Sequence, residues 1–259
     1  MNIDMKKLIL ALFAIPLLSY AAIVENNVSL KTSDDKMIIV DGEKEVEIYH
    51  QEDNQGVTVT GRVGDYNYVD LGLPSGTKWA TYNVGATKPT EYGDYFAWGE
   101  TKPKENYSWE TYKWCKCSSN SMTKYCTDSK FGTVDNKKVL DAEDDAATAN
   151  WGSAWRMPSA EEIDELIDAC NWKLMDNYYA TGIAGRLGTS VYNGATIFLP
   201  AAGYRLGTDL YSAGFLGGCW SSSLRENYSR RASCLNFYDC RISRFNGRSL
   251  GQSIRAVLR

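Results

Sequence analysis

The sequence has a single histidine, His50, in 259 residues. Sites that need two imidazoles, such as a histidine-based zinc centre, are therefore excluded. His50 lies in the polar run EIYHQEDNQG, with no nucleophile-like setting nearby, and we expect a solvated surface residue. Together with the absence of other catalytic patterns, this predicts a protein that is not an enzyme.

An excess of positive charge is also missing. The chain has 28 Lys and Arg against 32 Asp and Glu, a net charge of −4. Proteins that bind nucleic acid carry clustered basic residues in excess, so we expect no nucleic-acid partner. The 44% hydrophobic and 12% aromatic content is that of a globular protein.

Long apolar runs are absent. The longest, residues 8–18, is too short for a membrane helix, which needs about 20 residues. Two lysines precede it and small residues follow up to Ala21, so residues 1–21 are predicted to be a secretory signal peptide. We expect a protein without a transmembrane segment that is exported and either secreted, periplasmic or associated with the cell surface.

The seven cysteines are an odd number, so at least one thiol has no partner within the chain. Export permits disulfides, and a bridge from Cys126 to Cys115 or Cys117 is the expected local one. A soft-metal site at the Cys-x-Cys pair is the weaker alternative because no histidine assists it. We predict no metal and no cofactor.

Two regions are predicted along the chain. Residues 22–61 carry brief alternating or apolar runs between Asp, Gly and Asn turns, typical of a short β-rich arm or spacer. Near Arg62 aromatic residues and glycine become frequent, and we expect one domain over 62–259. Within 66–85 a Pro-Ser-Gly turn separates two strand patterns, a hairpin that places four residues in the core: Val69, Leu71, Trp79 and Val84.

A helix is predicted to begin after Ser159, which forms a Ser-x-x-Glu capping box with Glu162. Apolar residues recur at helical spacing on one face: Ile163, Leu166, Ile167 and Cys170. The thiol of Cys170 is thus expected to be buried and structural rather than reactive. The carboxylates of this helix are expected to face water.

Two features of the middle of the chain have a structural and a ligand-binding interpretation. Large rings at Trp98, Trp109 and Trp114 are spaced irregularly, which favours loops pinned to a core over a sugar-stacking platform. The acidic stretch 141–150 begins like a capped helix. A surface helix is favoured there over calcium, because the alternating oxygen-donor pattern of an EF-hand is absent.

Five ordered motifs carry a family resemblance. They are YVDLGLPSGTKWATYNVGATKPTEYGDYFAWGET, DDAATANWGSAWRMPSAEEIDELI, IFLPAAGYR, the WSSS at 220–223 and GQSIRAV near the end. Over about residues 65–259 the chain resembles the Fibrobacter succinogenes major paralogous domain family. That resemblance implies an α+β, C-type-lectin-like domain with two helices, twisted antiparallel sheets and long loops, in a secreted or surface protein of Bacteroidetes-type bacteria.

The same resemblance extends to the formylglycine-generating enzyme, which implies a check of its paired cysteines. In a hairpin with Tyr238-Asp239 as its turn, Leu235 faces Ile242 and Cys234 faces Ser243. That register places Cys234 and Cys240 on opposite faces, so they cannot share a metal, and oxidase activity is not expected.

Arginine is concentrated near the end of the chain. Residues 174–259 hold ten Arg, no Lys and four acids, a net charge of +6, which leaves −10 for the rest. Six of these arginines lie in 224–250, where Tyr, Ser and Asn supply much of the remainder, a composition typical of binding surfaces. In the predicted hairpin the polar face turned outward contains Asn236, Tyr238, Arg241 and Ser243.

Five residue types are depleted in the same segment. Lys, Glu, Gln, Met and Trp contribute only Glu226 to 224–250. Randomised adenines in asparagine-type codons exclude these five, as in the variable proteins of diversity-generating retroelements. Diversification of this kind is one interpretation, and an ordinary arginine-rich region that drifted is the other.

We therefore predict a secreted, non-enzymatic recognition or adhesion module that binds a protein or glycan on another surface. A protein partner, and an acidic one, is favoured because the calcium-dependent sugar-binding triplets of C-type lectins are missing. The alternative is a structural component of a surface appendage or envelope complex. The predicted ligand-binding residues are Arg225, Asn227, Tyr228, Arg230, Arg231, Asn236, Tyr238, Arg241, Ser243, Arg244, Asn246 and Arg248.

Overall fold

The computed structural model describes residues 28–33, 36–41, 44–48, 56–225, 227–236 and 241–258, with only the backbone for 28–48 and 241–245. The chain divides into two compact units, residues 1–51 and residues 52–259. Within the described part, no helix has the length and apolar character needed to cross a membrane. His50 lies outside the described residues.

The first unit contains one small antiparallel sheet. Its strand order is β1-β2-β3, so β2 is central and the other two are edges. The strands are β1 (Val28–Ser33), β2 (Lys36–Asp41) and β3 (Lys44–Ile48).

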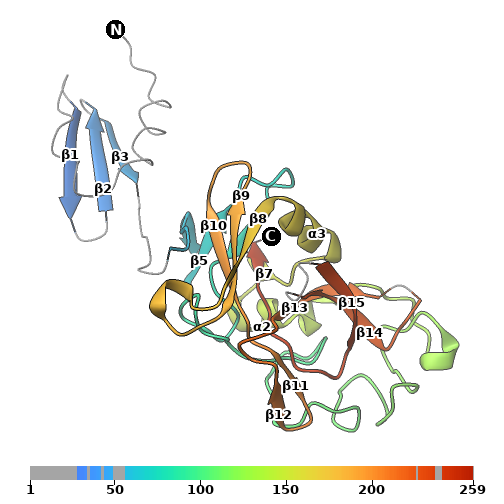
Figure 1. The fold of residues 1–259 in the computed structure, drawn as a ribbon. Coiled ribbons are helices and arrows are strands. Elements are labelled where there is room, and N and C mark those ends of the chain that lie inside the picture. The colour runs from blue at the N-terminus through green and yellow to red at the C-terminus, as the bar shows by residue number, and fades with distance from the viewer. Residues whose placement is uncertain are drawn as a thin grey trace. The chain divides into compact units, whose positions relative to one another are not determined.

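The second unit is an α+β structure with curled antiparallel sheets, as the sequence predicts (Figure 1). A five-stranded sheet joins the beginning and end of this unit, because the last strand pairs between two earlier ones. The predicted hairpin forms its centre, with Val69 opposite Trp79. In sheet order the strands are β4 (Gly61–Val63), β5 (Tyr66–Asp70), β6 (Lys78–Ala80), β16 (Val257–Leu258) and β7 (Trp155–Arg156).

The domain begins earlier than the expected Arg62. Val57 is buried against Tyr178 and Phe198, and the backbone N–H of Thr58 donates to the Thr196 carbonyl at 3.2 Å. These contacts make residues 56–61 part of the second unit, because their apolar and backbone polar groups are satisfied there.

A second sheet has the order β10-β9-β8. The strand β8 (Cys170–Met175) corrects one expectation. Cys170 is buried as predicted, but it begins this strand instead of continuing the helix before it. A separate hairpin follows this sheet. The remaining strands of these two sheets are β9 (Gly185–Ser190), β10 (Thr196–Pro200), β11 (Tyr204–Leu206) and β12 (Asp209–Tyr211).

The two predicted helices are present. The Ser159 hydroxyl accepts from the Glu162 N–H, and the Glu162 carboxylate accepts from the Ser159 N–H, which confirms the capping box. Not all carboxylates of this helix face water, since Glu162 pairs with Arg156 and Glu165 accepts from Ser75. The helices are α2 (Ala146–Trp151) and α3 (Ala160–Asp168), with short 3-10 turns η2 (Ser129–Phe131), η3 (Ala142–Asp144) and η4 (Tyr178–Ala180).

The third sheet has the order β13-β14-β15, and α3 packs against it (Figure 1). Leu235 pairs with Ile242 and Cys234 with Ser243, which confirms the predicted register. The predicted turn at Tyr238-Asp239 lies outside the described residues. The strands are β13 (Gly218–Leu224), β14 (Arg231–Asn236) and β15 (Arg241–Gly247).

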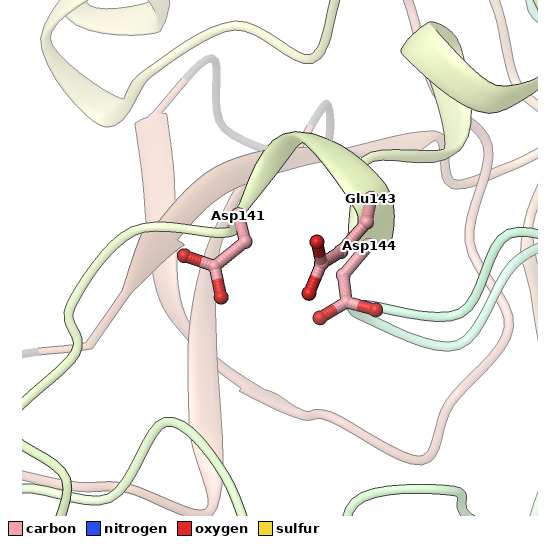
Figure 2. A group of neighbouring side chains, drawn as sticks. All are labelled: Asp141, Glu143 and Asp144. Atoms are coloured by element: carbon pink, nitrogen blue, oxygen red, sulfur yellow. The ribbon is translucent and has the colours of Figure 1, made fainter.

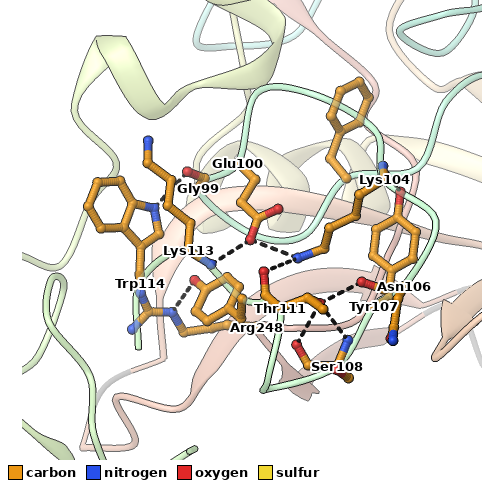
Figure 3. A network of polar contacts seen from close by, with 12 residues as sticks. Gly99, Glu100, Lys104, Asn106, Tyr107, Ser108, Thr111, Lys113, Trp114 and Arg248 are labelled. Atoms are coloured by element: carbon orange, nitrogen blue, oxygen red, sulfur yellow. Dashed lines mark hydrogen bonds and ion pairs between the residues drawn. The ribbon is translucent and has the colours of Figure 1, made fainter. Parts of the chain in front are cut away.

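Aromatic rings pin the long loops between β6 and β7. Trp98 is fully buried, its indole N–H donates to the Ser221 carbonyl at 2.8 Å, and its own carbonyl accepts from the Tyr112 hydroxyl at 2.6 Å. Trp114 donates to Gly99, and Figure 3 shows it in the same polar network as Glu100. The structural interpretation of Trp98 and Trp114 is confirmed, because their N–H groups are used within the chain.

The capping box gives a stability prediction. Ser159→Ala removes the hydroxyl that accepts from Glu162 N–H, and we expect the free energy of unfolding to fall by about 1 kcal/mol. Urea unfolding followed by circular dichroism measures the change. Ser153→Ala, on the exposed turn before β7, is the control and should leave the midpoint unchanged. An equal effect of both variants would contradict the role of the cap.

Candidate recognition surface

The loop between β13 and β14, together with the first residue of β14, carries five of the predicted ligand-binding residues. The Arg225 N–H donates to the Arg231 carbonyl at 3.0 Å, and the Arg231 N–H donates to the Tyr228 carbonyl at 2.8 Å. Asn227 has a φ of 60°, a left-handed conformation that asparagine tolerates well. These bonds fold the loop into a compact turn that closes on itself.

Ser229 anchors the middle of this loop to a distant segment. Its side chain is fully buried, and its hydroxyl accepts from the Thr127 N–H at 2.9 Å and lies 3.1 Å from the Thr127 hydroxyl. A buried hydroxyl with two polar contacts resists displacement, because an unsatisfied partner costs about 1–3 kcal/mol. The loop is therefore fixed in the middle, while Asn227 and Tyr228 beside the anchor are exposed.

Arg248 is not part of the surface, which corrects its predicted role. Its side chain is fully buried. Its guanidinium donates to the Tyr112 hydroxyl at 2.8 Å, and to the carbonyls of Tyr125, Ser229 and Lys124 at 3.0, 2.7 and 3.0 Å. Because these bonds occupy the guanidinium inside the protein, Arg248 positions the loop and cannot contact a ligand outside it. Figure 3 shows it beside Trp114.

Three arginines of the loop surround one exposed ring. The guanidinium carbons of Arg225, Arg230 and Arg231 lie 5.2, 5.5 and 5.8 Å from the centroid of Tyr228. Cation–π attraction at such distances is worth about 0.5–1 kcal/mol each at exposed sites. The ring thus organises three positive charges around one point.

The η2 turn contributes two more residues beside the Tyr228 ring, Phe131 and Lys130, and the sequence did not indicate either of them. Phe131 is buried with its centroid 5.6 Å from that of Tyr228, and Arg230 lies 5.4 Å from the Phe131 centroid. The Lys130 ammonium lies 5.0 Å from the same ring and pairs with Asp128 at 2.8 Å. We call Arg225, Tyr228, Arg230, Arg231, Lys130 and Phe131 the Tyr228 cluster.

Five of the remaining predicted residues lie on β14 and β15. Asn236 and Asn246 are half-buried, and the Asn246 amide donates to the Cys234 sulfur at 3.1 Å. Arg241, Ser243 and Arg244 are placed only by the backbone of β15. Tyr238 lies outside the described residues.

The expected division of β14 into an inner and an outer face is wrong over 232–235. Cys234 and Leu235 point to opposite sides, yet both are buried, in two different core clusters. The strand is central in its sheet and covered on both sides. Ser243 was expected on the outward face, but its partner on β14 is Cys234, whose side chain is buried.

None of the six described cysteines forms a disulfide. The expected bridge from Cys126 is absent, because its buried thiol donates to the Asp128 carbonyl at 3.2 Å. The Cys115 thiol donates instead to Trp109, at 3.1 Å, and the Cys117 thiol to Glu110, at 3.7 Å.

The interior thiols are poor nucleophiles. Burial raises the pKa of Cys170 to about 12, that of Cys219 to about 11 and that of Cys234 to about 12. At neutral pH these groups are protonated, whereas the thiolate is the reactive form.

The acidic stretch after β6 forms an ion-pair cluster. Asp141, Glu143 and Asp144 converge around η3 (Figure 2). The Lys124 ammonium lies 2.7, 3.5 and 2.6 Å from their carboxylate oxygens. Burial by itself raises the pKa of Asp144, but hydrogen bonds from Lys124, Tyr125 and Lys113 leave it below its usual value. A lysine supplies here the positive charge that calcium would bring, so the cluster has a structural role.

No protein-family model, curated protein or solved structure matches this chain. The family resemblance therefore stays a prediction. The geometry brings four predicted residues together: Arg225, Tyr228, Arg230 and Arg231.

The position of Arg248 gives the second prediction. Arg248→Met leaves three carbonyls and a hydroxyl without their buried donor, and we expect the free energy of unfolding to fall by about 3 kcal/mol or more. Arg248→Lys keeps the charge but lacks the planar fork, so a loss of about 2 kcal/mol is expected. Urea unfolding measures both.

Arg186→Met, on a half-buried arginine of β9, is the matched control and should cost less than about 1 kcal/mol. If Arg248→Met were as stable as this control, Arg248 would not hold the loop, and its assignment as a positioning residue would be wrong.

Proposed function

We propose that this chain is an exported, non-enzymatic recognition module that binds a protein or glycan on another surface through the Tyr228 cluster. The observation that carries the proposal is an exposed tyrosine surrounded by half-buried arginines, on a loop held on a buried base by Ser229 and Arg248. Tyr and Arg dominate the binding energy of many interfaces, and a rigid loop loses little entropy on binding.

The proposal places the chain in the Fibrobacter succinogenes major paralogous domain family, with a C-type-lectin-like fold. Two helices, curled antiparallel sheets and a long excursion of loops between β6 and β7 support that assignment. In such a fold, loops carry the binding residues on a rigid scaffold. Retroelement diversification of the loop remains part of the proposal, supported by the composition of 224–250.

The non-enzymatic part of the proposal is supported by the fate of the reactive groups. The thiols of Cys170, Cys219 and Cys234 are buried and protonated. The carboxylates of Asp141 and Asp144 are held in ion pairs with the Lys124 ammonium. Groups used in this way stabilise the fold and are not poised for proton transfer or nucleophilic attack.

Substitution of the exposed loop tests the function. In the variant Asn227→Gly/Tyr228→Ala/Arg230→Ala, in which glycine keeps the left-handed backbone at position 227, we expect binding to protein and glycan arrays, and to candidate bacterial or host cells, to fall at least about tenfold. The buried anchors Ser229 and Arg248 are untouched, so the urea midpoint should stay close to that of the wild type.

The control is Tyr192→Ala/Tyr211→Ala/Arg186→Ala, which removes similar side chains from other strands and loops. It should retain binding. Undiminished binding by the folded loop variant would refute the Tyr228 cluster as the recognition site.

A second candidate function rests on the first unit. The sheet β1-β2-β3 has two edge strands, and an edge can add a strand from another chain, as in donor-strand assembly. The chain would then be a structural component of a surface appendage or envelope complex. The observation that favours it is the compactness of this sheet as a unit of its own.

Deletion of residues 22–60 tests assembly. If the first unit mediates it, size-exclusion chromatography and cross-linking of the mature chain should show a concentration-dependent oligomer that the deletion converts to monomer. Val57 and Thr58 pack in the second unit, so the longer deletion also removes contacts there. A deletion of 22–51 removes the first unit alone and should convert the oligomer to monomer in the same way. A strictly monomeric mature chain at all concentrations would exclude this candidate.

A further inference from the structure

We infer that the Tyr228 cluster recognises an acidic segment of a partner protein, through carboxylates that bind its arginines. The inference rests on the proposed function and names the chemistry of its ligand. Its second element is the η2 turn, where Lys130 is a binding residue beside the loop and the buried Phe131 holds Lys130 and Arg230 in place.

The first argument is charge density. Three guanidinium groups lie within 5.8 Å of one ring centroid, so no two are farther apart than twice that distance. Such separations are comparable to the screening length of about 8 Å at physiological ionic strength, so one anion would be attracted by all three groups. Arg230 forms no ion pair with a described residue, while Lys130 pairs with Asp128 at 2.8 Å. An anion placed beside Arg230 would therefore meet a guanidinium that no described carboxylate neutralises.

The second argument is the geometry of the charged groups. An arginine fork binds a carboxylate through two parallel hydrogen bonds, and these charge-assisted bonds are stronger than neutral ones. Arg230 lies against two neighbouring rings, 5.5 Å from the centroid of Tyr228 and 5.4 Å from that of Phe131, which are themselves 5.6 Å apart. Two aromatic contacts restrict the side chain, so less rotamer freedom is lost when it binds.

The third argument separates a charged ligand from a stacked sugar. Sugar stacking needs an open aromatic face. Phe131 is buried, and the Tyr228 ring has three guanidinium groups around it. The rings therefore serve to hold cations in place, and the cations are the groups that a ligand meets.

The fourth argument favours a short acidic segment over a long sulfated polysaccharide. Residues 124–145, which include η2 and contact the loop through Thr127 and the Lys124 carbonyl, carry four lysines and six carboxylates. A long polyanion that extended from the cluster along this segment would meet net negative charge. A protein segment with two or three neighbouring Asp or Glu residues fits the compact positive cluster without that repulsion.

A labelled peptide with three consecutive glutamates between neutral residues tests the inference by fluorescence anisotropy. Wild-type protein should bind it, more weakly as salt rises. The variant Arg225→Gln/Arg230→Gln/Arg231→Gln should weaken binding at least about tenfold, and Lys130→Gln alone about threefold. The same-charge control, Arg62→Gln/Arg186→Gln/Arg205→Gln, removes three arginines from β4, β9 and β11 and should bind like the wild type.

Three outcomes would overturn the inference. Absence of peptide binding by the wild type excludes carboxylate recognition, and equal losses in both triple variants show a general effect of net charge. Heparin that binds more tightly than the peptide, and is lost in the loop variant, identifies a sulfated polysaccharide as the ligand class instead.

The same variants in the array and cell assays separate the inference from the proposed function. If the loop variant loses array binding although the wild type ignores the peptide, the recognition site stands and only its ligand chemistry is wrong. If neither assay responds to the loop variant, both fail. A urea midpoint for each variant ensures that lost binding does not reflect unfolding; if the triple variant were unfolded, Lys130→Gln, whose side chain is 63% exposed, would still decide the case.

Discussion

The buried guanidinium of Arg248 is the contact on which the candidate surface depends. Its hydrogen bonds join Tyr112, Lys124 and Tyr125 to Ser229, which lies more than 100 residues later in the sequence. No described carboxylate pairs with it. Backbone carbonyls solvate the charge instead, which is possible only where irregular loops leave carbonyls unused by strands or helices. A charge satisfied in this way demands one arrangement of those loops, because any other would leave it buried without partners.

A second buried arginine does the same for the other half of the domain. Arg255 donates to the side chain of Asn83 and to the carbonyls of Ala80, Thr81 and Phe198 at 3.0–3.2 Å. Burial lowers the pKa of Arg255 to about 10, so it remains charged at neutral pH. Arg248 lies in the 224–250 segment, whose composition resembles a binding surface, and Arg255 belongs to the same arginine-rich end of the chain, residues 174–259. The concentration of arginine near the end of the chain therefore has two physical causes, and only one of them is at the surface.

How much the sequence could predict follows from the range of each interaction. The capping box at Ser159 depends on neighbours three residues apart, and the pairing of Leu235 with Ile242 depends on the alternation of apolar residues about one short turn. Both were predictable. The burial of Arg248 depends on carbonyls at positions 124, 125 and 229, and no local pattern distinguishes this arginine from Arg230. Likewise, the end of α3 at Asp168 could not be inferred, since Cys170 continues the apolar spacing while the chain enters β8.

The same limit explains why Phe131 and Lys130 were missed. Nothing in DSKFG indicates a partner, and the turn gains its meaning only from the contacts of Thr127 with Ser229, 102 residues away. Those contacts satisfy buried polar groups, so they are strongly favoured. They do not involve the side chains of Asn227 and Tyr228, which lie close to Ser229 and are exposed. A loop anchored by its buried residues leaves its exposed positions open to substitution at little cost in stability. That separation between anchor and contact residues is what a recognition surface needs if its specificity is to change while its fold does not.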